Sequence, residues 1–564
     1  MNTINRWLGA LDSEPSWRTV DKIVICACVA LCACYGILGH LDYPAERIRG
    51  SDSIGYYVYL PSLLLQGDLD LAEDFQTLGG KDIFLFPAKD GLAGNPYAIG
   101  TAVLWSPWFL LGHLIAGVSS YATDGYSAPY FFLVYWGNAL YVLVGLLILV
   151  RLLRSFDLSA NSALIATLCT LLATQLTYYI FPLSATSHGA SFASTAAFLL
   201  SARRTGLSWQ TGLLGGLSAL LRWQNILILS VVALVIHLTD QKRLTLDRLR
   251  SYLPFAICAV LAMLPQMAVW QTLYGQPFTV PQLEGYVDPL RFPTLKILFS
   301  LRHGLITWHP LWLLAGAGIF LLRKRHRPWA IAIGVLFCLQ LYTNGTVRDW
   351  WGEWSFGHRR FVNLLPLFAI GIAVLAEELS EHRRSALLGV CVFLLLWNQA
   401  FIFQYQRALI PRSHPPTWTE FAKDKFMLGR VWRAQLAVNT AVQSFRRSDF
   451  ASYLEFAHQA AHAHPEFRNT RKVVSVARLT EGHIGSALND FEAWLEIEPW
   501  SRAARWGIAD IRVKLGQLDQ AKQEMASLGL SVDAFPPLAS GKGTLLTPEF
   551  FQVYLEELGQ IYTE

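Results

Sequence analysis

Long apolar stretches recur along most of this chain, and they limit what it can fold into. An α-helix needs about 20 apolar residues to cross the hydrocarbon core of a bilayer. Stretches of about this length lie near 22–41, 129–150, 161–181, 188–202, 206–221, 224–239, 253–273, 304–322, 329–344, 361–376 and 385–403. We therefore predict an all-α, polytopic bundle of about 11 membrane helices.

Charged residues are scarce and unevenly placed. They make up 15% of the chain, against roughly 25% in soluble domains, and they become frequent only after residue 404. The net charge is +5, and the lysine and arginine residues lie beside apolar stretches and not in a basic tract. We therefore expect no nucleic-acid partner. The four cysteines from Cys26 to Cys34 have a spacing that could suit a metal, but inside an apolar span thiols behave as small hydrophobic side chains.

Clusters of arginine and lysine set the expected orientation, because short loops rich in these residues stay in the cytosol. Five clusters face the cytosol together if the N-terminal residues 1–21 do so: 151–154, 203–204, 242–250, 323–327 and 383–384. The first loop then lies outside, and over residues 42–97 it has nine acidic residues against four basic ones. The C-terminal domain is expected on the same, non-cytoplasmic side.

Residues 101–118 do not fit this count. The segment is apolar enough to cross, but one more span would move the arginines at 151–154 to the outside. Pro107 interrupts it, and its tryptophans suit a helix that lies in the outer membrane interface. We therefore predict one long external segment from 42 to 128.

The tail has an internal period of 34 residues. Gly482 and Gly516 are separated by this interval, and so are Ala487 and Ala521. The period resembles that of the tetratricopeptide helix-turn-helix repeat. The predicted organisation is a membrane domain (22–404), a linker (405–431), repeats (432–530) and a C-terminal extension (531–564). Such repeats bind peptides or partner proteins, and a helical cap on the membrane domain is an equal alternative.

Polar side chains gather at the predicted outer ends of the spans. Asp52 lies shortly after the first span and precedes Tyr56 and Tyr57. An acid beside an aromatic surface is partly desolvated, which suits a general base. The alternative is an ordinary solvated loop aspartate.

A second polar group lies in the stretch RDWWGEWSFGHRRFVN, residues 348–363. Its tryptophans are typical of a membrane interface. Arg359 and Arg360 oppose the orientation rule, and an anionic lipid headgroup would explain them, because guanidinium matches phosphate oxygens. Glu353 and His358 accompany them.

Three further stretches place polar residues at outer ends: PLSATSHGA with His188, LLRWQN with Arg222 and Gln224, and FSLRHGLITWHP with Arg302 and His303. Charges at such margins are expected to face one another across a polar cavity. Snorkelling to the headgroups could explain any one of them alone.

These parts, in this order, resemble the GT-C membrane glycosyltransferases, over roughly residues 15–405. This group includes the protein O-mannosyltransferases and the aminoarabinose transferase. SDSIGYYVYLPSLL, SLRHGLITWHPL and WWGEWSFGHRRF especially resemble bacterial members. The resemblance implies an enzyme of the bacterial inner membrane and cell envelope. It would transfer a sugar, with inversion, from a polyprenyl-phosphate donor to a periplasmic lipid, polysaccharide or protein acceptor.

The resemblance also assigns roles to residues. Asp52 would be the catalytic base. The donor phosphate would be held by Arg222, Arg302, Arg359 and His303. The substrates would further contact Tyr56, Tyr57, His188, Gln224, Glu353, His358 and Arg360.

Metal dependence and two other functions stay open. Several relatives have an Asp-Glu pair where this chain has Asp52 and Ser53; a divalent metal, if used, would have Asp52, His188 and Glu353 as ligands. A transporter or flippase of a lipid-linked substrate would favour matched interrupted helices in two halves of the chain, which are not evident. A non-catalytic scaffold that displays the repeats is the third hypothesis.

Overall fold

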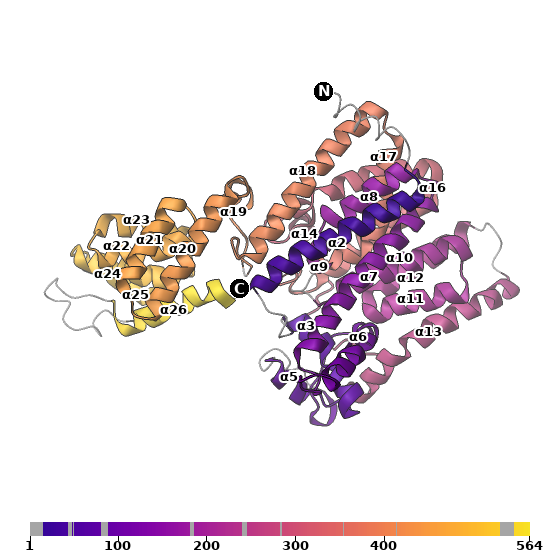
Figure 1. Ribbon diagram of the computed structural model, residues 1–564, viewed down its shortest axis with the longest axis horizontal. Helices are drawn as coiled ribbons and strands as arrows, with labels where there is room; N and C mark the ends of the chain where they lie inside the picture. The colour runs from indigo at the N-terminus through magenta and orange to yellow at the C-terminus, as the bar shows by residue number, and fades with distance from the viewer. Residues whose placement is uncertain are drawn as a thin grey trace. The chain divides into compact units, whose positions relative to one another are not determined.

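The computed structural model describes residues 15–42, 48, 50–79, 88–180, 185–239, 245–281, 285–353, 355–412, 414–530 and 546–563. The chain divides into two compact units, Met1–Gln399 and Ala400–Glu564 (Figure 1). Within these ranges the regular structure is helical, and an isolated antiparallel bridge joins Val287 to Val347. The predicted all-α class is confirmed.

Each predicted apolar span falls mainly on helix, and the span at 161–181 is divided at residues 173–175 between two helices. The helices are α2 (Trp17–Asp42), α7 (Ala128–Arg154), α8 (Ala160–Leu172), α9 (Leu176–Ile180), α10 (Ser187–Thr205), α11 (Trp209–Leu221), α12 (Ile226–Thr239), α13 (Leu246–Tyr274), α16 (Leu311–Thr346), α17 (Leu365–Glu378) and α18 (Glu381–Gln406). Five described helical segments are long and apolar enough to cross a membrane: α7, α13, α16, Arg359–Glu378 and α18. The number of crossings, about eleven, stays a prediction.

Helix α16 is two antiparallel arms and not one long rod. In a straight helix, residues 25 apart would be about 37 Å apart, yet the rings of Trp312 and Phe337 lie 6.3 Å apart. The reversal is at His326, where φ is −135° and ψ is 59°. The two arms correspond to the two spans predicted there, and the basic residues 323–327 lie at the reversal.

The predicted external segment folds onto the start of α7. It contains α3 (Ser51–Tyr57), α4 (Tyr59–Pro61), η1 (Ser62–Gln66), α5 (Ala72–Thr77), η2 (Lys89–Gly91) and α6 (Gly100–Gly117). Helix α6 includes Pro107 and is the helix predicted at 101–118. Trp108 packs against Gly137 of α7, where a Cβ would lie 2.3 Å from the indole ring. That α6 lies in the membrane interface stays a prediction.

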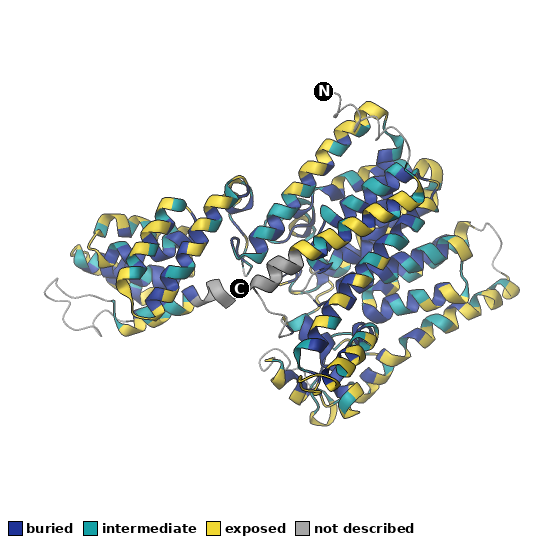
Figure 2. Ribbon diagram, viewed as in Figure 1, coloured by how far each residue is buried: buried dark blue, intermediate teal, exposed yellow. Residues whose placement is uncertain are grey.

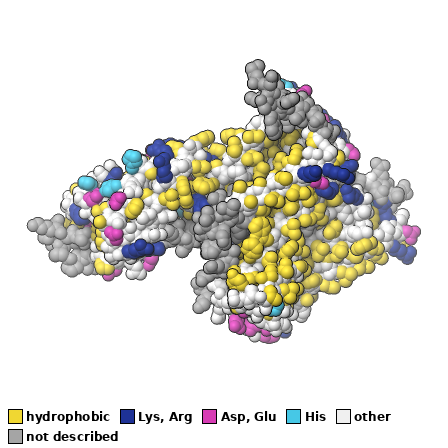
Figure 3. Space-filling view, viewed as in Figure 1, with side chains coloured by type: hydrophobic (Ala, Val, Ile, Leu, Met, Phe, Trp, Pro, Cys, Tyr) yellow, Lys and Arg dark blue, Asp and Glu magenta, His cyan; other side chains and the backbone are white. Residues whose placement is uncertain are grey.

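The two ends of the first unit differ in charge. Helices α7 and α10 finish in Arg151, Arg154, Arg203 and Arg204, and Arg325 at the reversal of α16 pairs with Glu378 at 2.9 Å. Figure 3 shows a broad hydrophobic surface on this unit, with lysine and arginine at one end and acidic side chains at the other. Which end faces the cytosol stays a prediction from the sequence.

The second unit is built from α19 (Trp418–Phe421), η5 (Lys423–Met427), α20 (Leu428–Arg446), α21 (Phe450–Ala463), α22 (Arg468–Thr480), α23 (Ile484–Ile497), α24 (Arg502–Lys514), α25 (Leu518–Ser527) and α26 (Pro548–Thr563). Gly482 and Gly516 adopt φ of 83° and 76° in the turns before α23 and α25. Ala487 and Ala521 are fully buried, as a repeat requires.

Two parts of the tail are more structured than their predicted roles suggest. The stretch predicted as a linker contains α19, η5 and the start of α20. The stretch predicted as an extension contains α26, whose Phe550, Tyr554 and Leu558 are fully buried in the core of this unit (Figure 2). Helix α26 therefore completes the packing of the repeats.

Helices α16 and α17 approach each other closely through glycines. A Cβ on Gly318 would lie 1.7 Å from the carbonyl oxygen of Gly371, and a Cβ on Gly371 would lie 2.2 Å from that of Ala315. A side chain at either glycine would push the two backbones apart. Small residues at such positions are what allow membrane helices to pack closely.

We expect Gly318→Ala to lower the free energy of unfolding by about 1–3 kcal/mol, because it overpacks this contact. Gly316→Ala on the same arm is the control, since nothing lies within 4 Å of a Cβ there. Thermal unfolding in detergent compares the two. Equal stability of both variants would contradict the packing described here.

Candidate functional site

The candidate site lies where several chain segments begin or turn at one end of the first unit. Asp52 is in the first turn of α3, and His188 is the second residue of α10. Arg222 ends α11 in an extended conformation, and Arg359 begins the 3₁₀ segment η4 (Arg359–Leu364). Helices α10 and α17 run from this end toward the end that carries the basic clusters, so the site lies opposite those clusters.

Asp52 and Arg359 form the central contact of the site. Arg359 Nη1 donates to Asp52 Oδ2 at 2.5 Å, and both side chains are only 16% exposed. The other carboxylate oxygen accepts from the hydroxyl of Tyr97 at 2.9 Å. Burial raises the pKa of Tyr97 well above its ordinary value, so this hydroxyl stays protonated and remains a donor.

Arg222 lies beside this pair and has only neutral partners. Its Nη1 donates to Ser187 Oγ at 3.0 Å and to His188 Nδ1 at 3.3 Å. With its amide oxygen turned toward the guanidinium, Gln224 accepts from Arg222 Nη2 and Nε at 2.7 and 3.1 Å. Among the described residues no carboxylate forms an ion pair with Arg222, although the charge of Asp52 acts on it through space.

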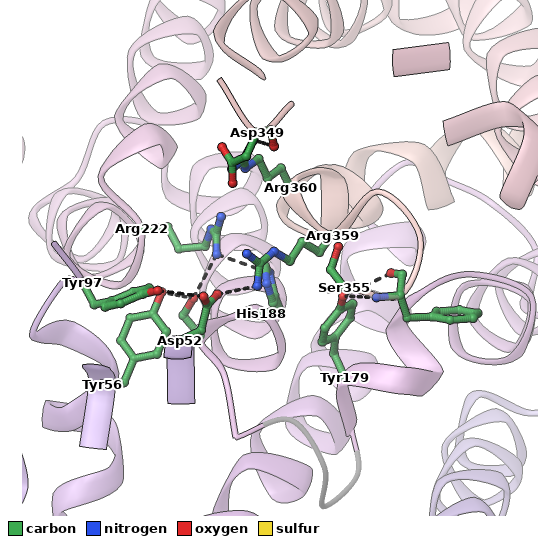
Figure 4. Close-up of polar contacts among 12 residues, drawn as sticks. Asp52, Tyr56, Tyr97, Tyr179, His188, Arg222, Asp349, Ser355, Arg359 and Arg360 are labelled. Carbon is green, nitrogen blue, oxygen red and sulfur yellow. Dashed lines mark hydrogen bonds and ion pairs between the residues drawn. The ribbon is translucent and has the colours of Figure 1, made fainter. Parts of the chain in front are cut away.

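Figure 4 shows the side chains of Asp52, Arg222 and Arg359 pointing toward one another. Tyr56 closes the same group, because its hydroxyl lies 2.9 Å from that of Ser187. Since His188 Nδ1 accepts from Arg222, the proton of this imidazole is on Nε2, which is buried without a partner among the residues described.

Two glycines allow these close approaches. The ring of Tyr97 packs on Gly55 of α3, where a Cβ would lie 2.1 Å from the ring. Gly357, with φ of 59°, turns the chain just before Arg359, and a Cβ there would meet His309 Nε2 at 2.4 Å. Larger residues at either position would displace the groups that reach Asp52.

Arg360 has a different partner from its neighbour. It donates to both carboxylate oxygens of Asp349, at 2.8 and 2.7 Å, and to the hydroxyl of Tyr286 at 3.1 Å. Burial opposes ionisation of Asp349, but the positive charge and hydrogen bonds of Arg360 outweigh it and hold the pKa of Asp349 below its ordinary value. Arg360 is therefore compensated, which differs from the substrate contact predicted for it.

Arg302, His303 and Glu353 form a separate group. Arg302 stacks over the ring of Trp351 at 4.0 Å, and His303 Nδ1 donates to Trp351 O at 2.8 Å. Glu353 is exposed and has φ of 53°. No contact of these three residues with Asp52 is described, although His303 lies close enough to Arg359 for the guanidinium charge to act on its ring. The phosphate-binding role of Arg302 and His303 stays a prediction.

Tyr57 and His358, two further predicted substrate contacts, have partners outside the Asp52 group. Tyr57 turns into the external segment, where its hydroxyl donates to Gly125 O at 2.6 Å and its ring packs on Phe109. His358 is buried against Phe361, and its carbonyl accepts from Gln175 at 3.4 Å. Neither side chain has a described contact with the Asp52 group.

Sequence reasoning missed Tyr97, Ser187 and Tyr179. Tyr97 lies 45 residues from Asp52 in a loop, and nothing in the sequence relates the two. Ser187 adjoins the predicted His188, so it was the one that proximity could have found. Tyr179 packs its ring 4.6 Å from that of His188.

The metal site suggested by Asp52, His188 and Glu353 is not assembled. Asp52 is paired with Arg359, His188 faces Arg222, and Glu353 is on the surface. Across the described ranges no group of three His, Cys, Asp or Glu side chains could hold a metal ion. We therefore derive no metal-dependent step.

His303 should make stability depend on pH. Burial lowers the pKa of His303 to about 4. Between about pH 6.5 and 4 this imidazole is therefore protonated in the unfolded chain but neutral in the folded chain. Stability contributed by the neutral ring is present above this window and is lost as the pH falls through it. We expect His303→Asn to reduce that loss by up to about 3 kcal/mol.

Asparagine is the matched replacement at this position. His303 has φ of 57°, which asparagine tolerates, and its amide can replace Nδ1 as donor to Trp351 O. Thermal unfolding of both proteins between pH 7 and 4 makes the comparison. Parallel curves would show that His303 is not the group that titrates.

Parts of this chain are similar to a known protein family and to a solved structure. Residues 478–542 match a family model described as tetratricopeptide repeat. No curated protein matches the sequence. The crystal structure of ArnT from Cupriavidus metallidurans in the apo state is similar over 82% of this chain and 79% of its own, at 15% identity and a TM-score of 0.44. At that TM-score the likeness carries no functional argument. The tail does contain tetratricopeptide repeats, as its 34-residue period predicts.

Proposed function

We propose that the chain is a membrane glycosyltransferase that uses a polyprenyl-phosphate sugar as donor. The observation that carries this proposal is Arg222, a largely buried cation that forms no ion pair with any described residue, beside the Asp52–Arg359 ion pair. A buried charge is costly unless it is paired, so a site of this kind favours an anionic ligand.

A phosphate suits this site better than a carboxylate or a neutral sugar. Two guanidinium groups offer several N–H donors in the planar geometry that matches phosphate oxygens. The unpartnered Nε2–H of His188 offers a further donor. A lipid-linked phosphate also explains why the site lies at the end of a bundle with long apolar helices, because its chain would remain in the bilayer.

Asp52 is the base in the proposed reaction. It takes the proton of the acceptor hydroxyl while that oxygen forms a bond to the anomeric carbon of the sugar. The bond from that carbon to the phosphate oxygen breaks, and the polyprenyl phosphate leaves with the electron pair. Attack from the face opposite the leaving group inverts the configuration. Arg222 and Arg359 stabilise the charge that develops on the phosphate.

The ion pair between Asp52 and Arg359 must loosen for this step. Both carboxylate oxygens of Asp52 already accept a hydrogen bond, Oδ2 from Arg359 and Oδ1 from Tyr97. A donor phosphate competes for the same guanidinium, and its arrival releases Asp52. The proposed site is therefore inactive as a base until the donor is bound.

The rest of the proposal concerns location and partners. The basic clusters at the opposite end support a cytoplasmic N-terminus and a periplasmic site in a bacterial inner membrane. The acceptor would be a lipid, polysaccharide or protein of the cell envelope. The tetratricopeptide repeats would bind a protein partner.

Asp52→Asn tests the base and its competitor together. We expect sugar transfer to fall by at least about 10²-fold, while binding of polyprenyl phosphate becomes about tenfold tighter, because Arg359 loses its carboxylate partner. Asp90→Asn is the control, since Asp90 is exposed in the same external segment. Transfer is measured with a radiolabelled polyprenyl-phosphate sugar, and binding by displacement of a fluorescent analogue.

The two outcomes separate the hypotheses. Unchanged transfer in Asp52→Asn would remove Asp52 as the base. Tight binding of the lipid phosphate without transfer by the wild type would favour a transporter. Absence of both would favour a scaffold.

Arg222 and Arg360 should respond differently to the same change. Arg222→Gln removes a charge that forms no ion pair with a described residue, so we expect a donor KM higher by about 10–100-fold with little change in thermal stability. Arg360→Gln leaves Asp349 buried without its partner, so we expect a loss of about 3–5 kcal/mol in the free energy of unfolding. Kinetics and thermal unfolding of both variants are compared. A similar loss of stability in both would contradict the distinction.

A further inference from the structure

A chain of buried amides and hydroxyls joins three elements that carry the site. Asn363 Nδ2 donates to Asn225 Oδ1 at 2.7 Å, and Asn225 Nδ2 donates to Ser191 Oγ at 2.9 Å and to Ser218 O at 3.0 Å. The hydroxyl of Thr195 lies 3.1 Å from that of Ser218. All five residues are at most 3% exposed.

Each of these elements presents a site residue one helical turn away. Ser191 follows His188 by three residues on α10. Asn225 follows Arg222 by three, and its N–H donates to Arg222 O at 2.8 Å. Asn363 follows Arg359 by four on η4. The bond from Asn363 to Asn225 is therefore a direct tie between the two segments that carry the arginines.

We propose that Asn225 and Asn363 are positioning residues whose hydrogen bond sets the distance between Arg222 and Arg359, and so the fit of the site to a phosphate. This inference rests on the proposed function in one respect, that these two arginines hold a phosphate.

The charges of the site make such a tie necessary. Arg222 and Arg359 are close enough to repel each other, and like charges without a ligand between them tend to separate. Asp52 is bonded to Arg359 but forms no ion pair with Arg222. Its attraction for Arg222 acts without a hydrogen bond, so it restrains the distance between the two arginines less directly than a hydrogen bond would.

The hydrogen bond between Asn363 and Asn225 also stays intact during the proposed reaction. When a phosphate takes Arg359 from Asp52, the ionic restraint on η4 is lost, whereas an amide pair is unaffected by the ligand's charge. Breaking the pair leaves a buried amide oxygen or N–H without a partner, which opposes any movement. The pair is thus suited to keep both arginines in place before and after the donor binds.

Asn363→Ala tests this role, with Ser159→Ala as control. Ser159 Oγ donates to Glu377 Oε2 at 2.5 Å, so it ties α8 to α17 at the other end of the unit. We expect Asn363→Ala to raise the donor KM and the dissociation constant of polyprenyl phosphate about tenfold, with kcat changed less than about threefold. Ser159→Ala should leave both values as in the wild type.

Asn225→Ala completes a double-mutant cycle. Asn225 also bonds Ser191 and Ser218, so the double variant should lose no more affinity than Asn225→Ala alone. Asn363→Ser, which leaves a hydroxyl in the buried space, serves the same test if the alanine variant does not fold. Unchanged affinity in the single variants, additive losses, or an equal loss in Ser159→Ala would each overturn the proposal.

The proposed function can fail separately. If the wild type binds no polyprenyl phosphate, that function is overturned, and the tie is decided by backbone hydrogen exchange without any ligand. Faster exchange over residues 359–363 in Asn363→Ala than in Ser159→Ala would support the tie, and equal exchange would overturn it.

Discussion

The ion pair between Asp52 and Arg359 is the constraint on which the candidate site depends. It joins residues 307 positions apart in the sequence, and so holds the start of α3 against the start of η4. A largely buried pair of this kind gains little stability by itself, because desolvation offsets most of the attraction, but the loss of one partner is costly for the other. Tyr97 donates a hydrogen bond to the second carboxylate oxygen of Asp52. Arg222 hydrogen-bonds the neutral Ser187, so it does not replace Arg359 as the ion-pair partner of Asp52.

The adjacent arginines show how local backbone geometry divides two similar side chains. In a 3₁₀ segment each residue advances by about 120° around the axis. Arg359 and Arg360 therefore leave η4 in different directions, one to Asp52 and the other to Asp349 and Tyr286. Arg360 Nη2 donates to both carboxylate oxygens of Asp349, and this pair also anchors the stretch that bridges Val347 to Val287. One arginine can thus serve the loop while its neighbour faces the site.

The sequence predicts the helices and the polar end of the unit because these follow from length and position. A span is visible as an apolar run, and an arginine at an outer end is visible because it opposes the orientation rule. Arg222 and Arg359 are predicted from their places at outer ends, and Asp52 from its place just after the first span. The pairing is not predicted, since Arg302 has the same sequence context as Arg222 yet stacks on Trp351. Tyr97 had no signal at all, because its role comes from a fold that packs its ring on Gly55.

The same contacts imply an order of events under the proposed function. Without a ligand, the carboxylate that would take the acceptor proton is held by a guanidinium and a tyrosine hydroxyl. An acceptor that arrives first meets a base already bonded to a cation, whereas a phosphate that arrives first draws the same cation away. Donor binding therefore precedes productive acceptor binding. Water needs the same base to attack the sugar. While no donor is bound, the hydrogen bonds on Asp52 therefore also limit its activation of water. An unpaired arginine next to a paired one is what makes the exchange feasible: Arg222 attracts the phosphate, and Arg359 transfers to it.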